Sequence, residues 1–245
     1  MRALILLGLI SILIGCQEQN PKTAQEIVDA AILSACPGGC DQVKVQFDFR
    51  DKHYKSSRDN GMFTYERIFK DSLGLIRDQL RNDGFTRFID DQVARIPDSL
   101  AFKYSNSVNS VHYFAQLPFG LNDPAVQKEY LGLTVIGGKS YHSIQITFRQ
   151  EGGGKDFEDQ FMYWFAEDDL RLEFLAYNYI TDGGGVRLRE AFNLREIDGI
   201  WFSDYRNYKP VSKETPLTDL PALFEAGELE LLSLIELENV IVDRS

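Results

Sequence analysis

Histidine and cysteine are scarce in this sequence, with three of each. His53, His112 and His142 lie outside any His-Glu-x-x-His zinc motif, and no Gly-x-Ser-x-Gly elbow offers an esterase nucleophile. Cys36 and Cys40 have no second cysteine pair or close histidine pair to complete four zinc ligands. We therefore predict no metal site, no cofactor and no catalytic residues.

Basic residues are also in the minority. The chain has 26 Lys and Arg against 37 Asp and Glu, a net charge of −11, and no basic block is longer than two residues. Such a surface repels phosphate backbones, which argues against a nucleic-acid partner. The Gly152–Lys155 run lacks the Ser or Thr that a phosphate-binding loop places after its Lys, because Asp156 stands there. Arg149 also replaces the leading glycine, so we exclude a nucleotide.

The only long apolar run is near the N-terminus, between Met1-Arg2 and Leu13-Ile14-Gly15-Cys16. It is shorter than the roughly 20 residues of a transmembrane helix. The closing tetrapeptide resembles the lipobox of bacterial lipoproteins. That resemblance implies cleavage after Gly15 and lipidation of Cys16. A plain signal peptide with a chance cysteine, or an uncleaved anchor, are the alternatives.

We predict three segments: a lipoprotein signal peptide over residues 1–15, a lipidated tether over residues 16–22, and a single β-rich domain over residues 23–245. Processing removes Arg2 and leaves 25 basic against 37 acidic residues. We expect the protein to face the periplasm of a Gram-negative-type bacterium. Its N-terminal lipid is expected to anchor it in the outer membrane. Cys36 and Cys40 flank a Pro-Gly-Gly turn, and in that oxidising compartment we predict a disulfide between them. Two free thiols are the alternative.

Two local patterns predict the first elements of the domain. Thr23 and Glu26 form a capping box at the start of a helix that Pro37-Gly38-Gly39 ends. From Val43 to Phe49 apolar and polar residues alternate, which is typical of a strand with one buried face. Further strands are expected over residues 62–69, 84–89, 100–104, 131–136, 140–149, 160–167, 170–181, 186–196, 200–210 and 229–242. Helices are expected from residues 105–110 onward and over residues 217–226.

Successive strands follow one another through short Gly- or Asp/Asn-rich turns with few helical crossovers, which predicts antiparallel pairing. The fold class is mainly β (α+β): a large curved antiparallel sheet or incomplete β-barrel with a few packed helices. The chain has 17 Phe, 11 Tyr and 2 Trp, and many strands carry aromatic residues on both faces. These rings either line a cavity inside the curved sheet or pack under helices and loops that cover both faces.

Segments 59–67, 104–113, 151–159, 181–187 and 228–239 resemble a family of Bacteroidetes envelope lipoproteins. The lipidated Cys, the polar tether, the helix ending in Gly-Gly and the run of strands resemble, in pattern, the LolA/LolB-like lipoprotein carriers. The second resemblance implies an incomplete β-barrel whose apolar hollow takes up acyl chains under a lid of helices.

Members of the first family are sometimes labelled deoxyribose-phosphate aldolase. Such an aldolase needs a (β/α)₈ barrel and a buried Lys for a Schiff base. This chain instead alternates strand with strand, and its lysines, such as Lys44 and Lys209, lie on polar strand faces or in loops. The residues do not support the label.

If the curved sheet is hollow, we expect apolar residues at its base and mixed aromatic and polar residues at its mouth. The candidates for the mouth are Tyr65, Arg67, His112, Tyr113, Tyr163, Tyr177 and Arg187. Arg187 and Arg189 share one strand face and either hold an anionic headgroup or pair with carboxylates on neighbouring strands. The carboxylates of Asp156, Glu158 and Asp159 suit Ca²⁺ in type but not in spacing, so we expect a solvated hairpin there.

The leading functional hypothesis is a lipid-anchored envelope lipoprotein that binds a hydrophobic or amphipathic ligand, such as an acyl chain, a lipid or a lipoprotein. The alternative is a non-catalytic interaction scaffold of the outer membrane, with a filled core and working loops at residues 151–159 and 181–185. An envelope hydrolase is the third hypothesis. It requires two carboxylates, or a nucleophile and its base, in one cleft.

Overall fold

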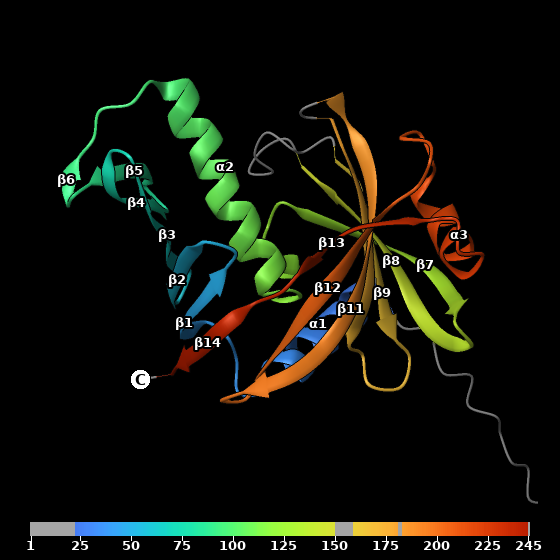
Figure 1. Ribbon diagram of the computed structural model, residues 1–245. Helices are drawn as coiled ribbons and strands as arrows, with labels where there is room; N and C mark the ends of the chain where they lie inside the picture. Colours follow the sequence, from blue (N-terminus) through green and yellow to red (C-terminus); the bar gives the residue numbers. More distant parts are fainter. Residues whose placement is uncertain (1–22, 150–158, 181–182, 245) are drawn as a thin grey trace, which may run out of the picture.

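A computed structural model describes residues 23–149, 159–180 and 183–244. These residues contain two antiparallel sheets of seven strands each and three α-helices (Figure 1). The first sheet has the order β14-β1-β2-β3-β4-β5-β6. Its strands are β1 (Gln42–Phe49), β2 (Lys52–Asp59), β3 (Met62–Asp71), β4 (Gly74–Arg81), β5 (Gly84–Ile89), β6 (Gln92–Val93) and β14 (Glu238–Asp243).

The second sheet has the order β13-β12-β11-β10-β9-β8-β7. Its strands are β7 (Val126–Ile136), β8 (Lys139–Phe148), β9 (Phe161–Ala166), β10 (Leu172–Tyr179), β11 (Gly185–Ile197), β12 (Ile200–Lys209) and β13 (Glu230–Ile235). The second sheet is a simple meander, whereas in the first sheet the C-terminal strand β14 pairs with β1; neither sheet closes on itself. The mainly β, antiparallel and unclosed architecture expected from the sequence is confirmed.

Three helices pack on this framework: α1 (Ala24–Ala35), α2 (Asp98–Ala115) and α3 (Leu220–Glu225), with the 3-10 turns η1 (Phe119–Asn122) and η3 (Leu217–Asp219). The predicted capping box is present at the start of α1, where Thr23 and Glu26 exchange hydrogen bonds. The helix ends at Cys36, immediately before the Pro-Gly-Gly turn.

Both faces of the second sheet are covered. On the face that we call inner, Ile27 and Val28 of α1 are fully buried among strand residues such as Ile144, Phe165 and Leu175. The opposite, outer face packs against η3 and α3 and carries Trp164, Phe174 and Leu188. Aromatic residues on both faces therefore reflect two covered faces in this part of the chain.

Helix α2 lies between the two sheets (Figure 1). It is a polar helix, since among its residues only Val108 and His112 are buried. Its main contacts are with β3, β4 and β5 of the first sheet. Near its C-terminus it also reaches the inner face of the second sheet, where Tyr113 and Phe114 join the α1 core.

Three expectations about individual elements were wrong. Residues 100–104 are not a strand but the first part of α2, which begins at Asp98 rather than near residue 105. Residues 229–242 form two strands in different sheets, because the backbone at Leu237 bonds with the Asp204 and Arg195 side chains instead of a ladder. Strands β2 and β4 were not expected, since Ser56, Arg58 and Asp78 share their buried positions with Tyr54 and Ile76 and interrupt the apolar alternation.

The predicted signal peptide, lipidated Cys16 and tether, and most of the 151–159 loop, lie outside the described residues. Within residues 23–149, 159–180 and 183–244, no helix is both long enough and apolar enough to cross a membrane. Cys36 and Cys40 are joined by a disulfide with a Cα–Cα distance of 6.0 Å, and both are buried beside Val45 and Phe202.

Candidate functional site

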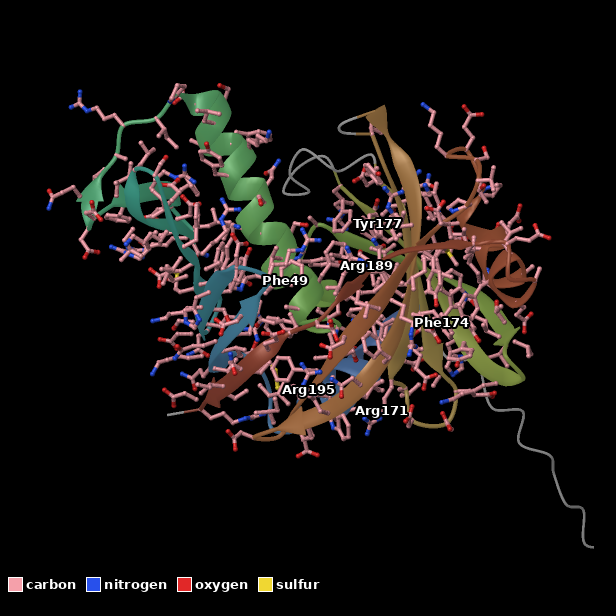
Figure 2. The ribbon with its side chains drawn as sticks, in the orientation of Figure 1. Phe49, Arg171, Phe174, Tyr177, Arg189 and Arg195 are labelled. Carbon is pink, nitrogen blue, oxygen red and sulfur yellow. A yellow bond between two sulfur atoms is a disulfide. The ribbon has the colours of Figure 1, made fainter. Side chains whose placement is uncertain are left out.

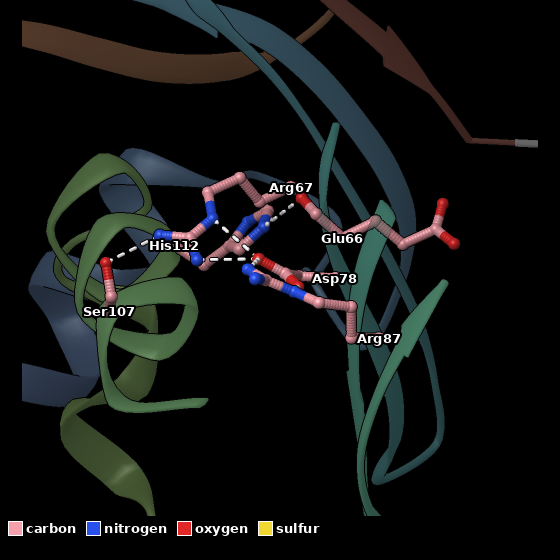
Figure 3. Close-up of polar contacts among 6 residues, drawn as sticks. All are labelled: Glu66, Arg67, Asp78, Arg87, Ser107 and His112. Carbon is pink, nitrogen blue, oxygen red and sulfur yellow. Dashed lines mark hydrogen bonds and ion pairs between the residues drawn. The ribbon is translucent and has the colours of Figure 1, made fainter. Parts of the chain in front are cut away.

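An ion cluster of Arg67, Asp78 and Arg87 lies beneath α2 on the first sheet (Figure 3). The three residues are direct cross-strand neighbours on β3, β4 and β5, so they share one face. Asp78 is 0% exposed and accepts hydrogen bonds from both guanidinium groups at 2.6 to 3.1 Å. Two cations on one carboxylate leave the cluster with an excess charge of +1.

Helix α2 docks on this ion cluster through polar contacts. Arg67 donates from Nη1 to the Ser107 hydroxyl at 2.7 Å, and the Arg87 guanidinium lies 3.7 Å from the Tyr104 ring centre. One turn further on, His112 donates from Nε2 to the Glu66 carbonyl at 3.0 Å. Its ring stacks on Tyr65 with a centroid distance of 4.6 Å. Burial of the imidazole, which is 1% exposed, lowers the pKa of His112 to about 4.

The opposite side of α2 meets a group of residues on the inner face of the second sheet. We call this group the interior site and define it as Phe114 of α2 with Phe161, Tyr163, Tyr177 and Arg189 of β9, β10 and β11. Phe161 and Tyr177 are cross-strand partners whose rings stack at 5.6 Å, and Phe114 lies 5.4 Å from Tyr177. The interior site is therefore a continuous group of aromatic rings shared by α2 and the inner face of the second sheet.

Tyr163 lies at the base of the interior site and is 0% exposed. Its hydroxyl oxygen is 2.7 Å from that of Tyr113 on α2. Burial raises the pKa of both hydroxyls, and it raises the pKa of the neighbouring Tyr205 to about 12. All three tyrosines are thus neutral hydrogen-bonding groups at physiological pH.

Arg189 is the charged member of the interior site. It is 9% exposed, its guanidinium lies 3.9 Å from the Phe114 ring centre, and Nη2 donates to the Tyr177 hydroxyl at 2.9 Å. Its Nε is buried without a hydrogen-bond partner, and no carboxylate of the described residues forms an ion pair with it. Figure 2 shows Tyr177 and Arg189 next to each other on the second sheet.

The seven residues predicted for the mouth of a cavity fall into separate groups. Tyr65, Arg67 and His112 lie between α2 and the first sheet, whereas Tyr113, Tyr163 and Tyr177 lie between α2 and the second sheet. Arg187 is near the second group and donates to the Tyr179 hydroxyl at 2.6 Å. In this structure all seven make contacts within the protein.

Sequence reasoning missed Asp78, Arg87, Phe114 and Phe161 as members of these groups. The two charges lie in strands whose alternation is weak or was not recognised, and the two phenylalanines carry no chemistry that distinguishes them from core residues. Arg189 was visible as the second arginine on the Arg187 face, and the structure makes it the more buried of the two.

Two small cavities flank Leu117 and Pro118 at the C-terminal end of α1, with volumes of about 20 and 30 Å³. A drug-sized ligand needs roughly 300–1,000 Å³, so each of these cavities is suited to ordered water. The smaller one is bordered by the disulfide and by Arg58, whose guanidinium lies 3.6 Å from the Phe119 ring centre. Across the described ranges, no three His, Cys, Asp or Glu side chains gather to hold a metal ion.

The model of one protein family, DUF6503, described as a family of unknown function, matches residues 2–237 of the chain. A comparison with curated proteins found no match.

Two solved structures are similar in fold. A DUF1329 family protein from Desulfovibrio piger has a TM-score of 0.51 at 13% identity, with 91% of this chain and 94% of that chain covered. A LolA superfamily protein from Nitrosomonas europaea has the same TM-score and identity, with 90% and 93% covered. The chain therefore shares the LolA-like fold, as the resemblance to the LolA/LolB-like carriers implied.

Proposed function

The chain belongs to the DUF6503 family, and we propose that it is a lipid-anchored lipoprotein of the bacterial cell envelope that binds an amphipathic ligand. The acyl chain of that ligand lies along the inner face of the second sheet, beneath α2. The observation that carries this proposal is the interior site: an aromatic surface with one buried arginine, on an unclosed sheet of LolA-like fold. Aromatic rings contact acyl chains at low entropy cost, and an arginine suits a polar head.

In the described form α1 and α2 pack on the inner face of the second sheet. A ligand that binds there must therefore replace contacts between one of these helices and the sheet. Helix α2 is the easier of the two to displace. It buries only Val108 and His112, and it is held to the first sheet by two hydrogen bonds, from Arg67 to its Ser107 and from its His112 to the Glu66 carbonyl. Water replaces such bonds at small net cost, whereas displacing α1 exposes Ile27, Val28 and Ala31.

Lipid uptake by the processed, delipidated protein tests the proposal. We expect mass spectrometry to find lipid that co-purifies from the envelope, and a fluorescent fatty acid to bind saturably. The double variant Tyr177→Ala with Arg187→Ala is expected to weaken uptake while the melting temperature falls only slightly. Tyr208→Ala is the matched control, because Tyr208 lies on the outer face against Phe224 and Glu190. An absence of both co-purified lipid and saturable uptake would contradict the proposal.

A second candidate, a non-catalytic interaction scaffold, is favoured by the small volumes of the two cavities beside Leu117. It predicts no saturable uptake. It also predicts that protection from hydrogen exchange in α2 stays the same when fatty acid is added.

A further inference from the structure

Arg189 differs from three arginines in or beside the second sheet. Arg171, Arg195 and Arg206 each have a carboxylate within ion-pair distance, at 2.9, 3.1 and 3.3 Å respectively. Arg189 is more buried than any of these three, yet its described contacts are two aromatic rings and one tyrosine hydroxyl. Figure 2 labels Arg189 and Arg195 on the second sheet, and Arg171 immediately before β10. The strand neighbour of Arg189, Arg187, also has no carboxylate partner among the described residues, but it is less buried and donates to the Val186 carbonyl and the Tyr179 hydroxyl.

An arginine is charged at every physiological pH, and burial of a charge without a counter-ion is unfavourable. Contacts with Phe114 and Tyr177 offset part of that cost through cation–π attraction. They leave the Nε–H unsatisfied. The cross-strand neighbour of Arg189 on β10 is the apolar Leu175. An apolar side chain would therefore pack at position 189 without the cost of a buried charge.

A second unsatisfied group lies on the next strand. Asn207 of β12 is the direct cross-strand partner of Arg189, so the two side chains share the inner face. Its amide NH₂ donates to Ser233 at 3.4 Å, while its Oδ1 is buried without a partner. The pair thus offers one unused donor on a cation and one unused acceptor.

From this arrangement we infer that Arg189 and Asn207 form a binding site for the head of the ligand, and that the head carries both an anionic oxygen and a hydroxyl. The anionic oxygen accepts from Nε of Arg189, and the hydroxyl donates to Oδ1 of Asn207. The monoanion of a phosphate monoester, which predominates below its second pKa of about 6, supplies both groups at one atom, whereas a carboxylate supplies only the first. This inference rests on the proposed function and names the ligand class: an acyl or alkyl chain that ends in a monoester phosphate.

Three probes with the same twelve-carbon chain test the site: dodecyl phosphate, laurate and dodecanol. Each is used below its micelle-forming concentration and at about pH 6, where roughly half of the dodecyl phosphate is the monoanion. We expect affinity to fall in that order, with dodecyl phosphate at least about tenfold tighter than dodecanol, as hydrogen bonds to charged groups imply. The Arg189→Leu variant is expected to bind each of the three probes only as weakly as the wild type binds dodecanol. Asn207→Leu is expected to remove only the preference for dodecyl phosphate over laurate.

Two control variants separate binding from folding. Arg171→Leu also removes a guanidinium stacked on a ring, that of Trp201, and is expected to leave the order of affinities unchanged. Without ligand, Arg189→Leu is expected to melt at or above the wild-type temperature. Arg195→Leu is expected to melt lower, because it deprives the buried Asp204 of its cation.

Equal binding of dodecanol and dodecyl phosphate by the wild type would overturn the inference and leave the proposed function standing. The inference would also be overturned if Arg189→Leu kept the preference for dodecyl phosphate over dodecanol, or if it melted at as low a temperature as Arg195→Leu. If Arg189→Leu does not fold, Arg189→Gln gives the same comparison of affinities. Failure of all three probes to bind would contradict the proposed function and the inference together.

Discussion

His112 and Tyr113 are neighbours in α2, yet their side chains contact different sheets. His112 bonds to the backbone of β3 in the first sheet, and Tyr113 meets the Tyr163 hydroxyl of β9 in the second. Consecutive residues of a helix point about 100° apart, so one helix between two sheets reaches both. This pair of residues makes α2 the part of the described chain that couples the ion cluster to the interior site.

Tyr113→Phe is expected to lower the free energy of unfolding by about 1–2 kcal/mol, because it leaves the buried Tyr163 hydroxyl without its partner. Tyr163→Phe should have a similar effect. The double variant should lose less than the sum of the two, since both hydroxyls are then absent. Urea unfolding of the four proteins measures this coupling, and strictly additive losses would show that the two hydroxyls do not interact.

Asp78→Asn is expected to lower the free energy of unfolding by about 3–5 kcal/mol, since it leaves Arg67 and Arg87 buried without a counter-ion. Asp91→Asn is the matched control. Asp91 also pairs with an arginine, Arg77, but it is exposed, and we expect a change within about 0.5 kcal/mol. Denaturant titration distinguishes the two; equal effects would mean that the ion cluster is no more important than a surface pair.

The pKa of about 4 that burial gives His112 predicts a dependence of stability on pH. The same residue titrates near 6.5 in the unfolded chain, so below that pH the unfolded state binds a proton that the folded state excludes. The stabilisation is complete above about pH 6.5 and is lost as the pH falls towards 4, by about 3 kcal/mol in all. In the His112→Gln variant, the urea midpoint of unfolding should change less with pH between about 6.5 and 4 than it does in the wild type. An unchanged slope in the variant would assign the loss to other groups.

The disulfide between Cys36 and Cys40 predicts that alkylation without reductant modifies neither residue. Its five-residue loop is short, so reduction should lower the free energy of unfolding by only about 2 kcal/mol. Mass spectrometry after alkylation reads the first expectation, and urea titration with and without reductant reads the second. Full labelling of both cysteines in the native protein would show free thiols.

Cys16→Ser is expected to leave the precursor unprocessed by the lipoprotein signal peptidase and to abolish acyl labelling. The reason is chemical, since the thioether-linked diacyl group requires the cysteine sulfur. Metabolic labelling with a clickable fatty acid, followed by an immunoblot for precursor size, gives the measurement. Normal labelling of the variant would refute the assignment of Cys16, and Cys36→Ser provides a control that should be acylated normally.

Local signals in the sequence were sufficient for several elements. The capping box of Thr23 and Glu26 predicted the start of α1, and the alternation from Val43 to Phe49 predicted β1. Residues 100–104 were wrongly predicted as a strand, because Leu100, Phe102 and Tyr104 alternate with other residues as in a strand. Their helical state follows from Asp98 in the first turn and from the docking of Tyr104 and Val108 at helical spacing.

The two candidate groups were less predictable. Arg67, Asp78 and Arg87 come from three strands, and only the strand register places their charges on one face beneath α2. The same holds for Arg189 and Asn207, whose proximity depends on the pairing of β11 with β12. A register shift of one residue in any one of these strands would turn its member to the other face of the sheet and separate the group.

The sequence by itself determined the mainly β architecture, because alternation and turn residues act over a few neighbouring positions. Tertiary structure alone decided that α1 fills the inner face of the second sheet, that α2 lies over a charged cluster, and that Arg189 has no carboxylate among the described residues. These outcomes depend on which distant segments exclude water from one another. That is a property of the packed chain, and no local pattern carries it.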